Sequence, residues 1–213
     1  MTPTLLPYGA RAVLLELPDA SARRALTHWL QQETTDGVDV IPAETTVLLD
    51  VSDLTVDDAT ARLLLAKVTG KLRDLDVEAL PQPTSSTAPP TPIDVVYDGP
   101  DLAAVAKLLG RSTEALIAWH TETPWNVEFL GFMPGFGYLT RDDHTTPIDR
   151  HRSPRRAIPT GSVGFAGSYC GIYPGSSPGG WQLVGRTDAT LFDATGDGAL
   201  LAAGGTVRFR AVR

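Results

Sequence analysis

Hydrophobic and polar positions alternate along the first 80 residues in a way that predicts short strands and amphipathic helices. Val- and Leu-rich runs bounded by turn residues indicate strands, and apolar residues at i, i+3 and i+4 indicate helices. The order strand, helix, strand, strand, helix, strand is the split βαβ pattern of a ferredoxin-like α+β domain. The predicted elements are strand 10–17, helix 20–33, strands 38–41 and 46–51, helix 55–69 and a last short strand 77–80.

Residues 81–92 consist mainly of Pro, Ser and Thr and lack apolar periodicity. Such a segment is extended and semi-rigid, so it is predicted to link two domains, residues 1–80 and 93–213.

The second domain begins with a predicted strand, 93–97, followed by two short helices on either side of Gly110. A DNA-binding helix-turn-helix has this pattern, but residues 112–120 contain Glu114 and no Lys or Arg. Such a helix suits neither phosphates nor guanine edges, so two helices packed on a sheet are the better interpretation. From Val127 onward, short apolar runs alternate with Gly and Pro, which is typical of a closed β architecture.

Two Gly- and aromatic-rich stretches stand out in this second domain, residues 129–139 and 159–187. Glycine lets the backbone approach a ligand or another strand closely, and aromatic rings supply large apolar faces. The stretches therefore indicate either a ligand-facing surface on a β scaffold or a set of tight turns that cap a β core.

The net charge of −7 is the wrong sign for a protein that binds nucleic acid by general electrostatics. Residues 1–80 carry most of it, with 7 Lys and Arg against 13 Asp and Glu. No apolar run approaches the length of a membrane span, and no signal peptide is recognised at the N-terminus. With a lone Cys170 and no intrachain disulfide, a cytoplasmic location is expected.

A local basic cluster in the second domain offers an anion its best electrostatic environment. It comprises Arg150, His151, Arg152, Arg155 and Arg156.

Familiar catalytic motifs give little support for an autonomous active site. Ser177 lies in a G-x-S-x-G pattern, but Pro178 follows it and has no N–H for an oxyanion, so a hydrogen-bonding loop residue is the better interpretation. No P-loop is present, and residues 161–167 form either an anion-binding nest or a tight turn.

Cys170 is expected to be buried and inert, and His144 and His151 lack a convincing third metal ligand. His120, at a helix end, is a candidate base or a helix-terminus hydrogen-bonding residue.

The motifs G-F-x-P-G-F-x-Y-L, P-x-G-S-V-G-x-A-G and G-I-Y-P-x-x-S-P-G-G-W-x-L-x-G-R-T resemble those of the KipI / allophanate hydrolase subunit 1 family. The resemblance spans nearly the whole chain and implies a cyclophilin-like β-barrel in the second domain. Gly137 stands where the family usually has Pro, and Tyr169-Cys170 stand where it usually has Gln-Thr. The best-understood enzymatic members are B subunits of bacterial 5-oxoprolinase.

The leading function that this resemblance implies is one subunit of an ATP-dependent amide hydrolase that opens 5-oxo-L-proline to L-glutamate. ATP and Mg²⁺ would act in the assembled complex, with an allophanate hydrolase subunit 2-like protein and a further 5-oxoprolinase subunit as partners, and the chain would be inactive alone. Two alternatives stay open: a KipI-type inhibitor that binds a sensor histidine kinase, and an allophanate- or urea-related hydrolase or carboxyltransferase subunit.

Candidate site residues come from the resemblance and from side-chain chemistry. Planar guanidinium groups bind carboxylates and phosphates through two hydrogen bonds, so the arginines are either anion-binding residues or ordinary solvated surface charge. The candidate catalytic residues are His120, Arg150 and Arg155. The candidate substrate-binding residues are Phe132, Pro134, Gly135, Phe136, Tyr138, Gly161, Ser162, Tyr173, Ser177, Gly179, Gly180, Trp181 and Arg186.

Overall fold

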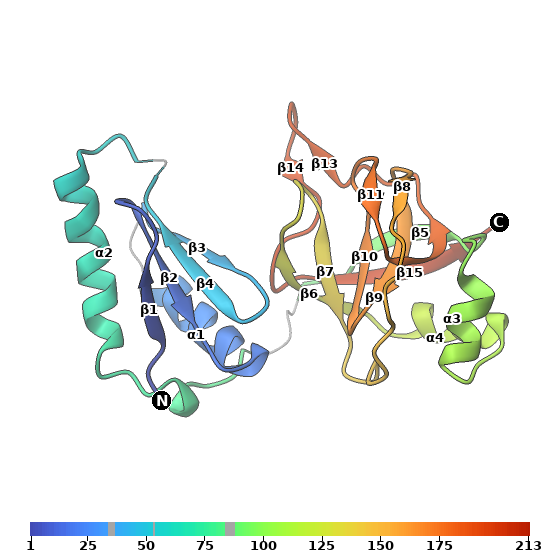
Figure 1. Ribbon diagram of the computed structural model, residues 1–213, viewed down its shortest axis with the longest axis horizontal. Helices are drawn as coiled ribbons and strands as arrows, with labels where there is room; N and C mark the ends of the chain where they lie inside the picture. Colours follow the sequence, from blue (N-terminus) through green and yellow to red (C-terminus); the bar gives the residue numbers. More distant parts are fainter. Residues whose placement is uncertain (34–36, 53, 84–87) are drawn as a thin grey trace. The chain divides into compact units, whose positions relative to one another are not determined.

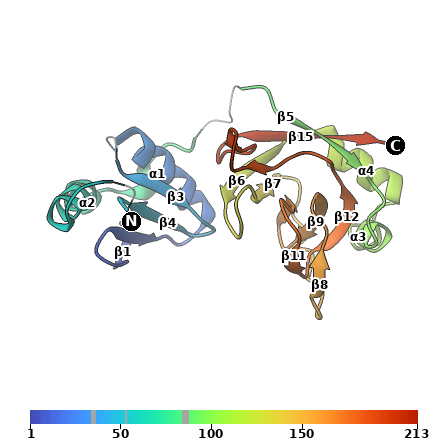
Figure 2. The same ribbon diagram turned by 90° about the horizontal axis from the view of Figure 1, so that it is seen from above.

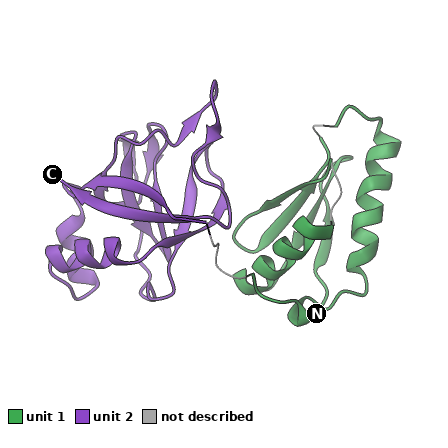
Figure 3. Ribbon diagram, turned by 180° about the vertical axis from the view of Figure 1, so that it is seen from behind, with its two compact units in different colours: residues 1–85 green, residues 86–213 purple. Residues whose placement is uncertain are grey.

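The computed structural model describes residues 1–33, 37–52, 54–83 and 88–213. The chain divides into two compact units, residues 1–85 and 86–213 (Figure 3). The boundary between the units falls inside the predicted linker, of which residues 84–87 lie outside the described part of the chain. The last two residues of the predicted linker, 91 and 92, already belong to the first barrel strand, which begins at Thr91.

The first unit is a four-stranded antiparallel sheet with two helices (Figure 1). The strand order is β1-β2-β4-β3, so the chain's first strand occupies one edge. The elements are β1 (Thr4–Pro7), β2 (Ala12–Glu16), α1 (Ala20–Glu33), β3 (Asp39–Pro42), β4 (Thr46–Asp50), α2 (Asp58–Leu72) and the 3₁₀ helix η1 (Val77–Ala79).

One face of this sheet forms the core of the unit with both helices. Leu15, Val47 and Leu49 alternate with less buried neighbours along β2 and β4, and they pack with Leu26 of α1 and Leu65 of α2. A period of two along a strand places such residues on one side of the sheet. Helix α1 accordingly lies behind the sheet in Figure 1 and in front of it in Figure 3.

The predicted element order differs from the structure at both ends of this unit. The predicted last strand, 77–80, is the 3₁₀ helix η1, and the edge position is filled by Thr4–Pro7 instead. All four residues of β1 are exposed, so its pattern shows no apolar alternation to predict a strand. Helix α2 begins after Asp57, whose carboxylate accepts the Thr60 N–H at 2.7 Å, and not after Thr55. The ferredoxin-like assignment therefore stays a prediction.

The second unit is a closed seven-stranded barrel of order β10-β7-β6-β15-β5-β12-β9, with β9 and β10 closing the ring. The first and last barrel strands, β5 and β15, pair in parallel and lie side by side in Figure 2. The barrel strands are β5 (Thr91–Val96), β6 (Trp125–Leu130), β7 (Gly137–Thr140), β9 (Ser162–Ala166), β10 (Tyr169–Ile172), β12 (Gln182–Arg186) and β15 (Thr206–Val212).

Two helices and two small ribbons decorate the barrel. The helices are α3 (Leu102–Leu108), which contacts β12, and α4 (Thr113–Glu122), which contacts β15. Ser112 caps α4 by accepting the Ala115 N–H at 3.1 Å, as its position after Gly110 predicts. The ribbons pair β8 (Arg155–Ile158) with β11 (Ser177–Gly179), and β13 (Phe192–Asp193) with β14 (Gly198–Ala199). None of the described helices is long and apolar enough to cross a membrane.

Strands β9 and β10 are covered on both faces, which explains why their sequence is almost continuously apolar or glycine. Phe165 and Cys170 point into the barrel core, whereas Ala166 and Tyr169 pack with a second apolar cluster on the outer side. The Gly- and aromatic-rich stretches of the sequence supply most of this outer cluster.

Candidate functional site

A group of aromatic side chains packs on the outer face of the barrel where β10 carries glycine. A Cβ on Gly171 would lie 2.8 Å from Phe136 Cζ and 2.9 Å from Trp181 Cζ3, so the rings occupy the space that a side chain would need. The Phe136 and Trp181 rings meet edge to face, with centroids 5.3 Å apart. We call this group the aromatic cluster; it comprises Phe132, Phe136, Tyr138, Tyr173 and Trp181.

Phe132 is the exposed member of the aromatic cluster and has an unusual backbone. Its φ is 71°, the only positive φ among the described non-glycine residues, and the Met133 N–H donates to Gly131 O at 2.9 Å across it. This three-residue turn is strained for a residue with a side chain. The side chain is 61% exposed although its ring touches Phe136 and Tyr173. A strained backbone that keeps a large apolar side chain exposed to solvent is typical of binding sites.

Arg150 supplies an exposed positive charge beside the cluster. It forms no ion pair with a described residue, and its Cβ lies 3.5 Å from the position a Cβ on Gly180 would take. Burial raises the pKa of the Tyr173 phenol to about 12, and the charges of Arg150 and Arg155 act against this rise. Arg150 therefore lies against Gly180, next in sequence to Trp181 of the cluster, with an exposed guanidinium group available to an anion.

Arg155 is held in place by a carboxylate that the sequence did not single out. Its Nη2 lies 2.9 and 2.8 Å from the two oxygens of Asp101, and its Nη1 donates to Trp181 O at 3.1 Å. The same carboxylate accepts the Leu183 N–H at 2.6 Å, and His151 Nε2 lies 3.2 Å from it. Burial alone would raise the pKa of Asp101, but these hydrogen bonds and the charge of Arg155 lower it overall. Asp101 thus connects two residues of the basic cluster, His151 and Arg155, to strand β12.

Ser177 and Gly179 lie on β11, which pairs with β8 along the edge of the aromatic cluster. The missing Cβ of Gly179 would lie 2.7 Å from both Ile158 Cδ1 and Tyr173 Oη. The Ser177 Oγ is buried and has no hydrogen-bond partner among the described residues. Because an unpaired buried hydroxyl is costly, a ligand atom or water is its natural partner. Ser177 sits in a strand and not at a strand-to-helix turn, so the geometry of a nucleophile elbow is absent at this position.

Three other predicted substrate-binding residues are used by the scaffold itself. Gly161 has φ 79°, its missing Cβ would lie 2.1 Å from Thr187 O, and its N–H donates to Tyr173 O. Ser162 Oγ donates to Pro159 O at 2.7 Å. Gly135 has φ 81° and packs against Leu191 O, in the turn that contains the exposed Pro134. The tight-turn interpretation of residues 161–167 is therefore favoured over an anion-binding nest.

His120 lies inside the barrel, away from the aromatic cluster. Its side chain is fully buried, Nδ1 is 2.5 Å from Tyr97 Oη, and Nε2 is 3.3 Å from Cys170 Sγ. Its ring stacks on Phe209 at 4.2 Å. Burial, reinforced by the charges of Arg141 and His144, lowers the pKa of His120 to about 3, and burial raises that of Cys170. A neutral, enclosed imidazole is a structural residue, and its catalytic role stays a prediction that this geometry does not favour.

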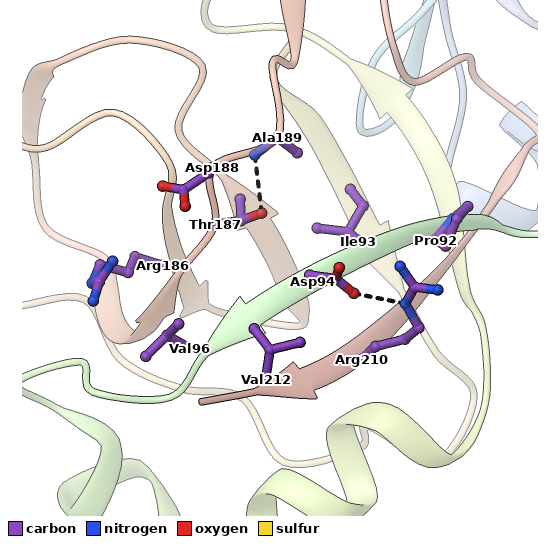
Figure 4. Close-up of a pocket in the computed structure, with 10 residues that line it drawn as sticks. All are labelled: Pro92, Ile93, Asp94, Val96, Arg186, Thr187, Asp188, Ala189, Arg210 and Val212. Carbon is purple, nitrogen blue, oxygen red and sulfur yellow. Dashed lines mark hydrogen bonds and ion pairs between the residues drawn. The ribbon is translucent and has the colours of Figure 1, made fainter.

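Arg186 lies at the opposite end of β12 from Trp181 and lines a different hollow (Figure 4). Its Nε is 2.9 Å from Asp98 Oδ2, and Arg210, across the hollow, is 2.6 Å from Asp94 Oδ1. The hollow has a volume of about 490 Å³ and a mixed-charge lining. Both of its arginines already have carboxylate partners, so it offers an anion less than Arg150 does.

The structure therefore brings together most, but not all, of the predicted site. The aromatic cluster, Ser177, Gly179, Gly180, Arg150 and Arg155 share one face, whereas His120 and Arg186 lie elsewhere. Among the described residues, no group of three or more His, Cys, Asp or Glu could hold a metal ion. The shared face exposes the Phe132 ring and the Arg150 guanidinium group, which can contact an apolar group and an anion, and its described residues contain no activated nucleophile.

The chain belongs to the family described as "Carboxyltransferase domain, subdomain C and D", whose model matches residues 3–202. It is 45% identical over 121 residues to the 5-oxoprolinase B subunit of Escherichia coli O157:H7, which is 55% of this chain and 56% of the relative. It is 46% identical over 112 residues to the 5-oxoprolinase B subunit of Bacillus subtilis (strain 168), covering 52% of this chain and 47% of the relative. The chain spans about half the length of these curated relatives.

A solved structure of a protein named TTHA0988 has a fold similar to this chain. The TM-score is 0.70 with 32% sequence identity, and the match covers 95% of this chain and 40% of that one. The similarity therefore extends over both units, which supports the mixed α and β architecture with a barrel.

Proposed function

We propose that this chain is a subunit of a multi-subunit, ATP-dependent 5-oxoprolinase that converts 5-oxo-L-proline to L-glutamate. The observation that carries the proposal is the exposed guanidinium of Arg150, which has no ion pair with a described residue, beside a glycine-walled aromatic cluster. A 5-oxoproline molecule has a small apolar ring edge and a carboxylate, which these two features complement. The two relatives that are named as 5-oxoprolinase B subunits support the same reaction.

The residues of this chain are proposed to bind and orient the substrate, not to attack it. Arg150 receives the carboxylate, the exposed Phe132 covers the ring, and the Ser177 hydroxyl bonds a polar ligand atom. Arg155 is paired with Asp101 and bonded to Trp181 O, so it is proposed to position the edge of the site. ATP, with Mg²⁺, would activate the lactam oxygen by phosphorylation in the assembled complex.

The chain is proposed to be inactive alone and to act in the cytoplasm with companion subunits. These are an allophanate hydrolase subunit 2-like protein and a further 5-oxoprolinase subunit. No group of three or more metal-binding side chains is found among the described residues, and we propose that the companion subunits supply the remaining chemistry.

One alternative draws on the same exposed apolar surface. If the chain is an inhibitor of a sensor histidine kinase, Phe132 would contact a protein helix in place of a ligand. Measurable binding to a kinase dimerisation domain, combined with no role in glutamate formation, would support that alternative. The allophanate- or urea-related alternative predicts an ATP-dependent complex that does not accept 5-oxoproline.

The decisive experiment combines the chain with its companion subunits and measures ATP-dependent glutamate formation, omitting each component in turn. Glutamate should appear only when this chain is present. Arg150→Ala should lower kcat/KM by about tenfold to a hundredfold, because a charge-assisted hydrogen bond contributes about 1.5–3 kcal/mol. Arg150→Lys should recover part of the loss.

The matched control is Arg156→Ala, because Arg156 is also an exposed arginine of the basic cluster. It should leave kcat/KM unchanged. An assembled complex that forms no glutamate, or an equal loss for both alanine variants, would contradict the proposal.

A further inference from the structure

The face of the first unit's sheet that the helices leave open carries a row of aliphatic side chains across all four strands. Leu6 of β1 is paired with Leu14 of β2, Leu14 with Leu48 of β4, and Leu48 with Ile41 of β3. Residues directly opposite one another in an antiparallel sheet point to the same side. The four side chains therefore form a continuous ridge about 14 Å long, from three strand spacings of about 4.8 Å.

This ridge is separate from the core of the unit. The core residues Leu15, Val47 and Leu49 alternate with Leu14 and Leu48 along β2 and β4, and the core includes no member of the ridge. The ridge ends are open: Leu6 is 39% exposed and Ile41 is 45% exposed. An exposed aliphatic row on a sheet is typical of interaction surfaces.

Acidic side chains lie on both sides of the ridge. Two residues away along the strands, one flank is formed by Glu16 and the other by Asp39 and Asp50, which are paired with each other. No Lys or Arg occupies a strand position of this sheet. Residues 1–80 as a whole carry a net charge of −6.

We propose that this open face, with its Leu6–Leu14–Leu48–Ile41 ridge, docks a different protein chain that presents aliphatic side chains flanked by Lys or Arg. A second copy of this chain does not fit. Any face-to-face pairing that aligns the two ridges would bring the acidic flanks together, and like charges at an interface cost several kcal/mol.

This inference rests on the proposed function for the identity of the occupant, which is a companion subunit of the complex. It assigns the two units different tasks. The barrel unit contacts the ligand through the aromatic cluster and Arg150, and the first unit recruits the partner through a surface that carries no ligand-binding group.

The test measures binding of purified chain to the purified allophanate hydrolase subunit 2-like protein by calorimetry. Leu6→Lys and Ile41→Lys place a charge on the ridge at exposed positions and should each weaken binding at least tenfold. The matched control is Leu63→Lys, because Leu63 is 71% exposed but lies on helix α2, outside the ridge. It should bind within twofold of the wild type.

A second arm tests the acidic flanks. The double variant Glu16→Gln/Asp39→Asn should weaken binding and reduce its salt dependence, because basic groups of the partner lose their counterparts. In the glutamate assay, Ile41→Lys should raise the partner concentration needed for half-maximal rate and leave the plateau rate unchanged.

Four outcomes would overturn the inference. Wild-type affinity of the ridge variants in an active complex would refute the docking surface and leave the proposed function standing, whereas no complex with the wild type would refute both. A wild-type dimer that Ile41→Lys dissolves would assign the face to a second copy. An increase in the radius of gyration of the free chain with Ile41→Lys would assign it to the chain's own barrel unit.

Discussion

The inside of the barrel and the aromatic cluster on its outside are both lined by aromatic rings, but they differ in how their polar groups are paired. Inside, both ring nitrogens of His120 have partners, and the Trp125 Nε1–H donates to the His120 carbonyl. Outside, Arg150 has no ion pair with a described residue, and the Ser177 Oγ is unpartnered within the described chain. The pairing of His120 indicates a stabilising role, although the interior is not completely paired: the buried Nε2 of His144, whose ring packs against Trp125 and Phe165, has no hydrogen-bond partner among the described residues. On the outside, an unpartnered hydroxyl and an exposed guanidinium beside a rigid aromatic base indicate a ligand site.

The largest effect should come from removing an interior ring. Phe209→Ala deletes a side chain that is 1% exposed and stacked on His120, so the free energy of unfolding should fall by about 3–5 kcal/mol. Urea denaturation followed by tryptophan fluorescence measures this change. Trp181→Ala removes a ring of the outer cluster for comparison. If both variants reduced substrate binding equally at a temperature where both are folded, the division of roles would be wrong.

Asp101 connects the scaffold to the site, and its removal should have the next largest effect. Asp101→Ala leaves the Leu183 N–H and the Arg155 charge without their partner, which should cost about 3 kcal/mol. Because the pKa of Asp101 is lowered, its stabilisation is present above pH 3.8 and is lost as pH falls below that value. Denaturation of the wild type and the variant at pH 3 and pH 6 should show a smaller difference at pH 3. An equal difference at both pH values would contradict this account.

The buried His120 predicts that the free energy of unfolding depends on pH, with an effect of intermediate size that arises in the barrel interior. Its folded pKa of about 3 lies below the ordinary 6.5, so the unfolded state takes up a proton first as pH falls. Stability should therefore decline below pH 6.5, by about 2 kcal/mol between pH 6.5 and 5. Nitrogen chemical shifts measured by NMR should show a neutral His120 ring at pH 5. A His120 ring that protonates near pH 6.5 would place it in contact with solvent.

The smallest stability effect and the clearest separation of roles should come from Phe132. Phe132→Gly relieves the positive φ, so the free energy of unfolding should change by less than about 1 kcal/mol and in the stabilising direction. Affinity for 5-oxoproline in the assembled complex should nevertheless fall. Phe132→Ala keeps the strained backbone without the ring, so it should lose the same affinity without the gain in stability. Normal affinity in both variants would remove Phe132 from the site.

Local pattern was sufficient to predict most elements of the first unit, but not the strand at its edge. Helix 20–33 and the paired strands after it have clear periodicity and apolar contrast. Strand β1 is exposed throughout, and its position is set by pairing with β2, which a linear pattern does not record. Residues 77–80 contain Val77 as a core anchor, and one buried residue does not distinguish a strand from a 3₁₀ turn.

The aromatic residues of the candidate site were proposed from the family resemblance and from the two glycine-rich stretches that contain them, and their role in ligand binding stays a prediction. Asp101 was missed because an Asp just before a helix ordinarily indicates a cap, and here the carboxylate makes no cap hydrogen bond and turns to Leu183 and Arg155. The burial of His120 could not be predicted from the sequence. The residues that contact its ring nitrogens, Tyr97 and Cys170, are 23 and 50 residues away along the chain.

The parallel pairing of the first and last barrel strands has a consequence for synthesis on the ribosome. Thr91 and Val207 are partners in that ladder, so the ring cannot close until nearly all of the second unit has been made. Until then β5 has an unpaired edge, which is prone to pairing with other chains. The first unit, whose contacts are complete by residue 85, can fold earlier. Shortening the chain within β15 should therefore produce aggregates with a folded first unit, not a smaller barrel.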